Sequence, residues 1–577
     1  MVEPESGGTP QVLATPTVTF KSLAFSDGTT VSLSDTDIIV LVGPNNAGKS
    51  VALRELRQHM GAPEAPTVVV SHASLRQTGT SAEFVEYFRK HVNEIVSGDS
   101  TQYLGYNLNF GLSHLSLETL WEGNFSTFAP FFCQLLETET RISASNPVPP
   151  GPFLTQPPSH PIHMIYLDEI LERKINTFFR KAFDLDLVVY HLGGSEIPLL
   201  VGDAPPLFAG EGRTTKAYAE RLFDSTVPLQ DQGDGMRSFA SVVLHALAPT
   251  TPTVLLLDEP EAFLHPPQAR LLGKILATER ATQGQLFVAT HSPDVLSGLM
   301  EGAPDKLRIF RMQRDGDVNR VDELDKAFVS KIMSDPLMKH SGALSGLFHE
   351  RVIVCESDAD CMFYSTVLDL PAVHGGHLPD VLFTHASGTG RMADLAEAFR
   401  AAGVEVDVLA DMDILGEEGN IKKLIEALGG EWEEVRGAVR EIKRAVEGEH
   451  RPATVKETLG ELQSIVASAE QHENSASLRR SVMDVFAKSS TWAQVKRAGE
   501  QAIPRGQPTE RYRNLRSRCA DLGLWFVPVG ELEAFCKGVG GKGPGWVQTV
   551  LEERSIADDS ELAEARKFMG DVWHHRH

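Results

Sequence analysis

The stretch Gly43-Pro-Asn-Asn-Ala-Gly-Lys-Ser50 decides the fold of the N-terminal half of this chain. An apolar run of strand length, IIVLV at 38–42, precedes it, and a helix-compatible run, VALRELRQHM at 51–60, follows it. The glycines let backbone N–H groups turn inward around phosphate oxygens, and the N-terminus of the following helix adds the positive end of its dipole. The GxxxxGK[ST] pattern between a strand and a helix is typical of a nucleotide-binding P-loop. We therefore predict an α/β fold that binds ATP.

The side chains of this loop have separate expected roles. Lys49 is expected to reach the β- and γ-phosphates, and Ser50 is expected to offer its hydroxyl to Mg²⁺. The loop residues that we expect to bind the nucleotide are Gly43, Asn45, Asn46, Gly48, Lys49 and Ser50.

Two later strands carry groups that would complete a nucleotide site. The apolar run at 254–257 ends in Asp258, whose carboxylate can hold the Mg²⁺ shell, and Glu259 can orient or deprotonate the attacking water. The run QLFVAT at 285–290 leads into His291, which can contact the γ-phosphate. A solvated strand end and an ordinary surface or core histidine are the alternatives for these residues.

A glycine-containing stretch before an apolar helix predicts a second surface for phosphates. Gly233-Asp-Gly235 precedes ASVVLHAL at 240–247, and glycines that open a helix expose its N–H groups to an anion. An ordinary glycine cap is the alternative.

The chain between these nucleotide motifs reads as inserted material. It contains a proline-rich break at 146–161 and helical patterns at about 81–97, 164–183 and 215–224. We expect residues 75–225 to form a largely helical insertion. It could dimerise or contact nucleic acid, but no motif decides between these roles, and helical packing is the default.

The C-terminal half places acidic residues after apolar strands. Glu356 follows the run RVIVC at 351–355, and the later run VEVDVLA at 404–410 ends in Asp411 and Asp413. The order strand, helix, strand, helix, strand predicts a parallel sheet. Alternate strand side chains share a face, so Asp411 and Asp413 are expected on the same side. Carboxylates gathered in this way form a cup for one or two Mg²⁺ ions.

Together these motifs resemble known families. The P-loop and the glycine stretch are similar to those of ABC-type ATPases of the DNA-repair and SMC class, in which a signature loop of one subunit covers the ATP held by the other. The acidic strand ends resemble the TOPRIM fold of topoisomerases, primases and nucleases. An ATPase half followed by a TOPRIM half resembles the OLD (overcoming lysogenisation defect) family, which includes the Gabija-type antiphage nucleases.

The resemblance implies a set of site residues. Glu356 and Asp360 match the first acidic pair of the family, and a later acid and a lysine complete the site. The implied metal ligands are Ser50 and Asp258 in the ATPase half and Glu356, Asp360, Asp411, Asp413 and Glu531 or Glu533 in the TOPRIM half. The implied catalytic residues are Glu259, Glu356, Asp411, Asp413 and Lys542, of which Lys542 would steady the scissile phosphate or the transition-state charge.

The sequence departs from the family pattern at three points. Glu356 is followed by Ser rather than the usual Gly, and the signature core is Gly-Asp-Gly rather than Ser-Gly-Gly. A charge-rich helical insert at about 417–515 separates the DxD pair from the later glutamates.

The resemblance implies an ABC-type ATPase domain at 1–335 and a TOPRIM nuclease domain at 349–577, with a linker near 335–348. It implies an ATP-dependent endonuclease of antiphage defence that cuts DNA with two Mg²⁺ ions, and dimerisation of the ATPase would control the cutting. Mn²⁺ and Ca²⁺ are the alternative metals. The implied partners are DNA, a second or further copy of the chain, and a helicase or another defence-system protein. Several alternatives stay open. The substrate could be RNA such as tRNA, the chain could be a sensor or scaffold that does not cut, and ATP could either activate or restrain cutting.

The charge balance limits how the chain can bind nucleic acid. It has 54 Lys and Arg against 78 Asp and Glu, a net charge of −24, so such contact needs a local basic strip or bound metal ions. The densest basic run, RYRNLRSR at 511–518, is either a phosphate-contacting strip or a solvated face.

Five scattered cysteines without a CxxC pair argue against a disulfide scaffold and a zinc ribbon. With no signal pattern and no apolar run of membrane length, we expect a cytoplasmic protein without a membrane segment.

Overall fold

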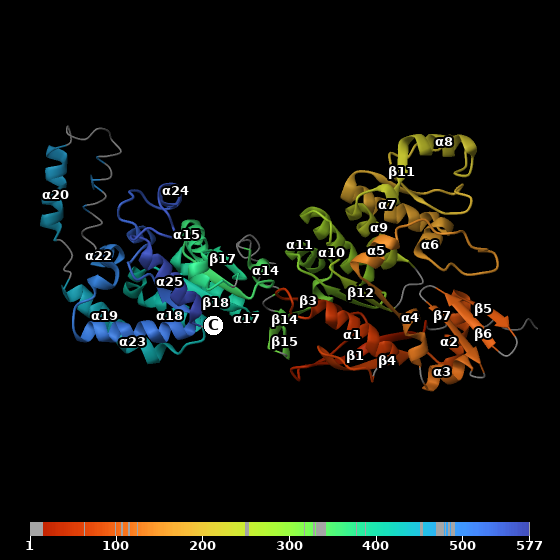
Figure 1. Cartoon of the computed structure of the whole chain (residues 1–577), viewed down its shortest axis with the longest axis horizontal. Coiled ribbons are helices and arrows are strands. Elements are labelled where there is room, and N and C mark those ends of the chain that lie inside the picture. Colours follow the sequence, from red (N-terminus) through yellow and green to blue (C-terminus); the bar gives the residue numbers. More distant parts are fainter. Residues whose placement is uncertain are drawn as a thin grey trace, which may run out of the picture. The chain divides into compact units, whose positions relative to one another are not determined.

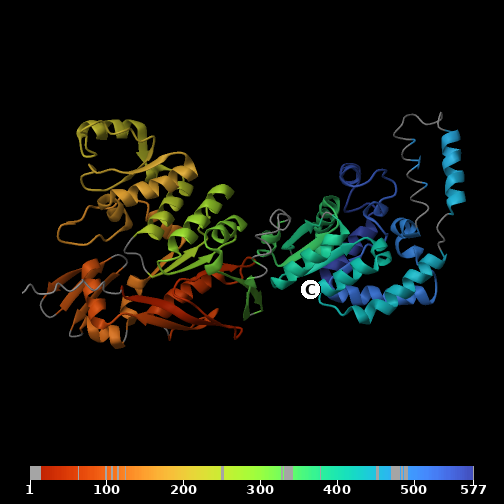
Figure 2. The same cartoon turned by 180° about the vertical axis from the view of Figure 1, so that it is seen from behind.

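A computed structural model of the chain (Figure 1, Figure 2) describes residues 15–575 apart from 63, 98–99, 106–107, 114–115, 124, 249–252, 317, 327–328, 330–341, 377, 387, 450–453, 469–477, 479–480, 483–484 and 486–490. The chain divides into two compact units, Met1–Leu324 (unit 1) and Asp325–His577 (unit 2). Residues 335–341 of the expected linker lie outside the described residues.

Unit 1 is built around a six-stranded sheet with the order β15-β14-β3-β13-β12-β8. Its strands are β3 (Ile38–Val42), β8 (Cys133–Leu136), β12 (Val254–Asp258), β13 (Gln285–Ala289), β14 (Leu307–Asp315) and β15 (Val318–Glu323). All pairs are parallel except β14 with β15, which is antiparallel. The three central strands are nearly unbroken apolar runs because a parallel sheet is covered on both faces.

Helices cover both faces of this sheet (Figure 1). On one side α1 (Lys49–Gly61) packs between the six-stranded sheet and a three-stranded antiparallel sheet of order β2-β1-β4. The strands of that sheet are β1 (Thr17–Phe25), β2 (Thr30–Ser32) and β4 (Val70–Thr78). The helices on the other side are α9 (Asp234–Leu247), α10 (Pro266–Arg280) and α11 (Pro293–Gly302). The predicted α/β fold with parallel strands around a P-loop is thus confirmed.

The prediction of a largely helical insertion at 75–225 is wrong, because this segment is mixed. The expected helix at 81–97 stops at His91, and Val92–Ser97 is the first strand of the antiparallel sheet β5-β6-β7. The β-branched Val92, Ile95 and Val96 favour an extended backbone, whereas a capping box at Thr80 fixes only the start of the helix.

The other elements of this segment include a second small sheet, of order β11-β10-β9, and strand β8 of the main sheet. The helices and strands of the segment are α2 (Ser81–His91), β5 (Val92–Ser97), β6 (Ser100–Gly105), β7 (Leu108–Ser113), α3 (Leu117–Gly123), α4 (Ala129–Phe132), α5 (Thr138–Ser143), α6 (Pro161–Leu167), α7 (Glu169–Phe183), β9 (Asp186–Val189), β10 (Leu199–Gly202), α8 (Lys216–Ser225) and β11 (Thr226–Pro228). The helices expected at 164–183 and 215–224 are present as α6 with α7 and as α8.

Unit 2 contains a four-stranded parallel sheet with the order β17-β16-β18-β19. Its strands are β16 (Arg351–Cys355), β17 (Val381–His385), β18 (Glu405–Ala410) and β19 (Leu524–Phe526). One face packs Ile353 and Cys355 against α15 (Asp358–Leu368), α16 (Pro371–His374), α24 (Pro544–Glu553) and α25 (Ala563–His574). On this sheet α17 (Met392–Ala401) contacts β16 and β18.

The helices that follow β18 come from the charge-rich insert. They are η5 (Met412–Gly416), α18 (Glu418–Ala427), α19 (Trp432–Glu449), α20 (Val455–Ala467), α22 (Thr491–Ala498), η7 (Gly499–Ala502) and α23 (Gln507–Leu522). The long helices α19 and α23 lie side by side (Figure 1). None of the helices described here has both the length and the apolar character to cross a membrane.

A buried ion pair ties the two central strands of unit 2 together. Arg351 on β16 donates to the carboxylate of Asp407 on β18, and the two side chains are 2% and 0% exposed. Arg351 also donates to the carbonyls of Val572 and Trp573 at the end of α25, where a cation complements the helix dipole. Trp525 of β19 donates its indole N–H to Asp407 at 2.8 Å. One pair thus joins three strands and a helix.

Replacing Arg351 should therefore destabilise unit 2 strongly. In Arg351→Met the carboxylate of Asp407 stays buried without its cation, a change that costs about 3–5 kcal/mol in other proteins. Arg436→Met, which removes the exposed ion pair of Arg436 with Glu433, is the control and should change the stability far less. Urea unfolding followed by tryptophan fluorescence measures the difference, since five of the six tryptophans lie in unit 2. Equal midpoints for the two variants would contradict the expectation.

Candidate functional site

The loop between β3 and α1 is folded as a phosphate cradle. Lys49 is the first residue of α1, and its ammonium donates to the carbonyls of Gly43 and Pro44 at 2.8 Å each. The lysine is buried, so its charge is held against the loop by backbone oxygens. Ser50 donates to Asp258 Oδ1 at 2.8 Å, which joins the loop to the end of β12.

Left-handed backbone angles shape this cradle. Gly43 has a φ of +139°, and a Cβ there would collide with the carbonyl of Met312 on β14, so only glycine fits. Gly48 (φ +91°) and Asn46 (φ +63°) are also left-handed. The loop opens into a cavity of about 570 Å³, whose lining includes Asn45, Asn46, Gly48, Lys49, Ser50, Glu259 and His291.

Glu259 and His291 face each other in this cavity. Glu259 Oε1 lies 3.4 Å from His291 Nε2, across the ends of the adjacent strands β12 and β13. Glu259 has a φ of +47°, a left-handed conformation that is rare outside glycine and is often kept at functional sites. Burial raises the pKa of Asp258, and the charge of Glu259 adds to this rise.

Sequence reasoning missed two residues that position these groups, the buried Arg141 and the partly buried Glu261. Arg141 on α5 donates to the carbonyls of Asp258 and Glu259, the latter at 2.9 Å, and so holds the left-handed turn. No motif marks Arg141, which lies 117 positions before Asp258. Glu261 accepts from the Thr290 hydroxyl and the His291 N–H at 2.7 and 2.8 Å. A signal for it was present in the sequence, because Glu261 is the third acid of the run Asp-Glu-Pro-Glu.

Gly233 and Gly235 are not among the described residues that line this cavity. Gly233 is the exposed N-cap of α9, and a Cβ on Gly235 would lie 2.6 Å from the carbonyl of Phe263. The start of α9 is therefore packed on the loop after β12.

In unit 2, Glu356 and the pair Asp411 and Asp413 follow the carboxyl ends of the adjacent strands β16 and β18. Burial raises the pKa of Asp411 to about 8; the cation of Lys496 opposes this rise, and the carboxylates of Glu356 and Asp360 add to it. The predicted first acid pair and the DxD pair are thus brought within one electrostatic cluster.

Sequence reasoning also missed Lys496, a cation that lies inside the acidic cluster. Its ammonium lies 2.8 Å from Asp411 Oδ2 and 3.5 Å from Asp413 Oδ2. Burial alone would lower the pKa of Lys496, but Asp411, Asp413 and Glu356 raise it, so the ammonium stays charged. The lysine comes from α22 in the insert, where no motif marks it.

Asp360 has a structural contact as well as a place in the cluster. Its Oδ2 accepts from the backbone N–H and the hydroxyl of Ser357 at 2.9 and 2.8 Å, which caps α15. Burial raises the pKa of Asp360, and the charges of Glu356 and Glu533 add to the rise. One oxygen of this carboxylate is therefore already used within the fold.

The two later glutamates differ in their surroundings. Glu531 is buried and accepts an ion pair from the exposed Lys542 at 3.0 Å. Glu533 accepts the backbone N–H of Gly543 at 2.7 Å, and its charge acts on Asp360, so it faces the cluster. Among the residues that the structure describes, no three His, Cys, Asp or Glu side chains are arranged to hold a metal ion.

Comparison with known proteins supports the nucleotide site. Residues 151–297 match the family model described as "AAA domain, putative AbiEii toxin, Type IV TA system". The Old nuclease of Escherichia phage P2 is 23% identical over 168 residues, which span 28% of this chain and 28% of that protein. The aligned part thus covers less than a third of the relative's length. The resemblance to the OLD-family nucleases, predicted from the motifs, is confirmed, and unit 1 carries a P-loop ATPase domain.

Among solved structures, the chain is similar to heads of SMC proteins. The SMC head domain from Thermotoga maritima is 16% identical, with 53% of this chain and 99% of that chain covered and a TM-score of 0.28. A Smc head domain with an extended coiled coil, bound to the C-terminal domain of ScpA and derived from Pyrococcus furiosus, is 11% identical, with 55% and 98% covered and a TM-score of 0.31.

Two substitutions should separate nucleotide binding from hydrolysis. Lys49→Ala removes the cation that would meet the phosphates and should abolish measurable ATP binding. Glu259→Gln keeps the cavity and should leave ATP binding near wild type while slowing hydrolysis about 10²-fold or more, because it removes the carboxylate that is expected to activate the attacking water. Fluorescent-nucleotide titration and phosphate release measure the two properties. Normal ATP affinity in Lys49→Ala would show that the cavity is not the nucleotide site.

Proposed function

We propose that this chain is an ATP-binding and ATP-hydrolysing enzyme whose unit 2 is a TOPRIM nuclease that cuts DNA with bound divalent metal ions. The observation that carries this proposal is the convergence of Glu356, Asp411 and Asp413 around one ammonium group at the ends of adjacent parallel strands. The resemblance to the Old nuclease of phage P2 supports it.

The donor chemistry of this cluster fits a hard divalent cation. Carboxylate oxygens are the ligands that Mg²⁺, Mn²⁺ and Ca²⁺ prefer, and the ammonium of Lys496 lies where the negative charge of Asp411 and Asp413 is concentrated. As they are arranged, the described acids do not form a three-ligand group. Metal binding would therefore require the Lys496 ammonium to leave Asp411 and the carboxylates to turn toward one another.

The residues of unit 2 would then have distinct roles. Glu356, Asp411, Asp413 and Glu533 would hold the metal, with Asp360 beside them. A bound pair of metal ions supplies activation of water and stabilisation of the leaving 3′-oxygen. Lys542 is exposed next to Glu531 and can reach a phosphate to offset its charge.

In unit 1 we propose that Lys49 and Ser50 bind ATP and Mg²⁺, that Glu259 orients or deprotonates the attacking water, and that His291 meets the γ-phosphate. The surface at Gly233 would cover the ATP of a second copy, so hydrolysis would need a homodimer or a higher oligomer. Dimerisation would gate access of DNA to unit 2. A role in antiphage defence, with a helicase or another defence-system protein as partner, rests on the family resemblance.

One observation favours a second function. The ion pair of Lys496 with both Asp411 and Asp413 would suit an ATP-driven sensor or scaffold whose unit 2 binds nucleic acid without cutting it. RNA such as tRNA is a further substrate class for the same site.

Asp411→Ala should abolish cleavage and leave ATP binding unchanged, because the nucleotide cavity is formed by unit 1 residues. The measurement is cutting of plasmid, linear DNA and tRNA by the full chain, with and without Mg²⁺ or Mn²⁺ and with and without ATP. Cutting by this variant at the wild-type rate would show that the cluster is not the nuclease site. A wild type that cuts none of the three substrates with any metal would favour the sensor.

Lys496→Met should tighten divalent-metal binding at the cluster. The substitution removes a positive charge that lies within 4 Å of two ligands, so we expect about tenfold higher Mn²⁺ affinity. Titration calorimetry without DNA or ATP measures it, and Asp411→Ala, titrated in parallel, identifies binding that belongs to unit 1. The exposed Lys422→Met is the control for a lost surface charge. Unchanged or weaker Mn²⁺ binding in Lys496→Met would show that the lysine does not compete with metal.

A further inference from the structure

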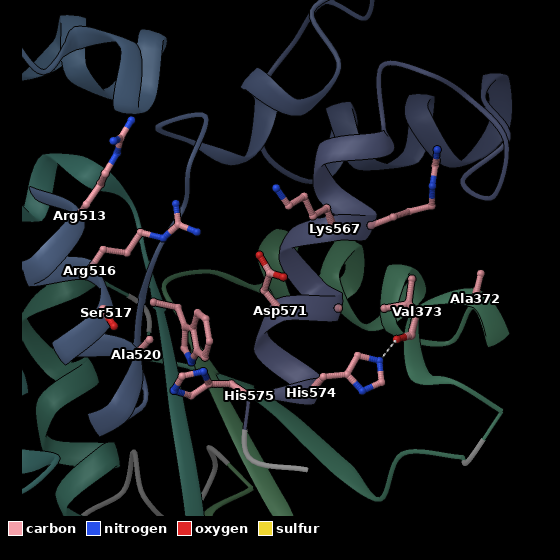
Figure 3. Close-up of a pocket in the computed structure, with 13 residues that line it drawn as sticks. Ala372, Val373, Arg513, Arg516, Ser517, Ala520, Lys567, Asp571, His574 and His575 are labelled. Carbon is pink, nitrogen blue, oxygen red and sulfur yellow. Dashed lines mark hydrogen bonds between the residues drawn. The ribbon is translucent and has the colours of Figure 1, made fainter. Parts of the chain in front are cut away.

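One pocket of unit 2 gathers cations from two helices (Figure 3). It has a volume of about 930 Å³ and lies between α23 and α25, with Trp525 of β19 in its lining. Its cationic lining residues are Arg513 and Arg516 from α23 and Arg566 and Lys567 from α25, and Asp571 is the acidic one. In a chain with a net charge of −24, such a surface is a local exception that attracts anions.

Two of these cations have no acidic partner. In the part of the chain that the structure describes, no carboxylate lies within 4 Å of Arg513 or Lys567, and both side chains are exposed. Arg566 donates to the carbonyls of Ile556 and Asp559 at 2.8 and 3.0 Å, which orients its guanidinium without neutralising its charge. The pocket thus offers positive charge that the fold itself does not use.

Helix periodicity divides the basic run 511–518 into two faces. Arg511 and Arg518 form ion pairs of 3.0 and 3.9 Å with glutamates of α19 and so belong to the packing of two helices. Arg513 and Arg516 lie three residues apart on the face that lines the pocket. Figure 3 shows Arg516 and Asp571 extending from their helices into the space between α23 and α25. The second face, with Arg513 and Arg516, is the one that lines this pocket.

The pocket is joined to the carboxylate cluster through a short chain of contacts. Glu500 of η7 accepts from Arg516 at 2.6 Å and from the Tyr512 hydroxyl at 3.2 Å. The Tyr512 hydroxyl also lies 3.9 Å from Met412 Sδ, and Met412 directly follows Asp411. A ligand that meets Arg516 is therefore linked through Glu500 and Tyr512 to the turn that carries the DxD pair.

We propose that this pocket binds the phosphodiester backbone of DNA, an inference that rests on the proposed nuclease function. A chain of repeated phosphates can meet cations on both walls at once, and guanidinium groups bind phosphate oxygens through paired N–H donors. The contacts are to the backbone, so they position the substrate and carry no sequence preference.

The test is binding of a fluorescein-labelled DNA duplex to the full chain in EDTA, where metal-dependent cutting does not interfere. The double variant Arg513→Ala/Lys567→Ala should bind about tenfold more weakly and should lower the slope of log K against log salt by about 2, one for each lost phosphate contact. The matched control Arg511→Ala/Arg518→Ala removes the same charge from the other face of α23 and should keep the wild-type slope. ATP binding and thermal unfolding report whether each variant is folded.

Several outcomes would overturn the proposal. One is an unchanged affinity and slope in Arg513→Ala/Lys567→Ala, and another is a wild type that binds no DNA at low salt. A third is displacement of the DNA by inorganic phosphate, which would identify the pocket as a site for small anions. The measurement needs neither metal nor cleavage. If Asp411→Ala still cut DNA, the nuclease assignment would fail while the binding result at Arg513 and Lys567 would stand.

Discussion

Both sites depend on one constraint of parallel sheets, which is that neighbouring strands end at the same edge. In unit 1 the adjacent strands β3, β13 and β12 lead into the P-loop, His291 and Asp258. In unit 2 the adjacent strands β16 and β18 lead into Glu356 and Asp411, and β19 continues toward Glu531. The sheet therefore brings together residues that are distant in the sequence, as with the bond between Ser50 and Asp258 across 208 positions.

This arrangement concentrates negative charge, and each unit balances it with a cation from outside the strand-end motifs. In unit 1, Arg141 bonds the backbone carbonyls of Asp258 and Glu259, so the carboxylate of Glu259 remains directed into the cavity. In unit 2, Lys496 bonds the carboxylate of Asp411 itself. Glu259 is therefore accessible as it stands, whereas Asp411 must exchange one cation for another before it can bind a metal.

The sequence predicted those parts of the fold and the nucleotide site that local patterns specify. The P-loop, the strand ending in Asp258 and the strand ending in Asp411 could be identified because their residues are contiguous and each apolar run is of strand length. Arg141 and Lys496 could not, since their positions result from tertiary packing of segments with no motif. The expected helix at 81–97 was wrong because its cap specifies only where the helix starts, and the β-branched residues after His91 favour a strand.

The insert after the DxD pair therefore belongs to the site and is not a peripheral addition. It supplies Lys496 to Asp411, and its η7 supplies Glu500, which accepts a hydrogen bond from Arg516 in the lining of the basic pocket. The sheet of unit 2 without these helices would present Asp411 without the cation of Lys496 and would lose one of the two cationic walls. Because a single segment, 496–500, contacts both the acidic cluster and α23, any shift of this segment changes the surroundings of the carboxylates and of the basic pocket together.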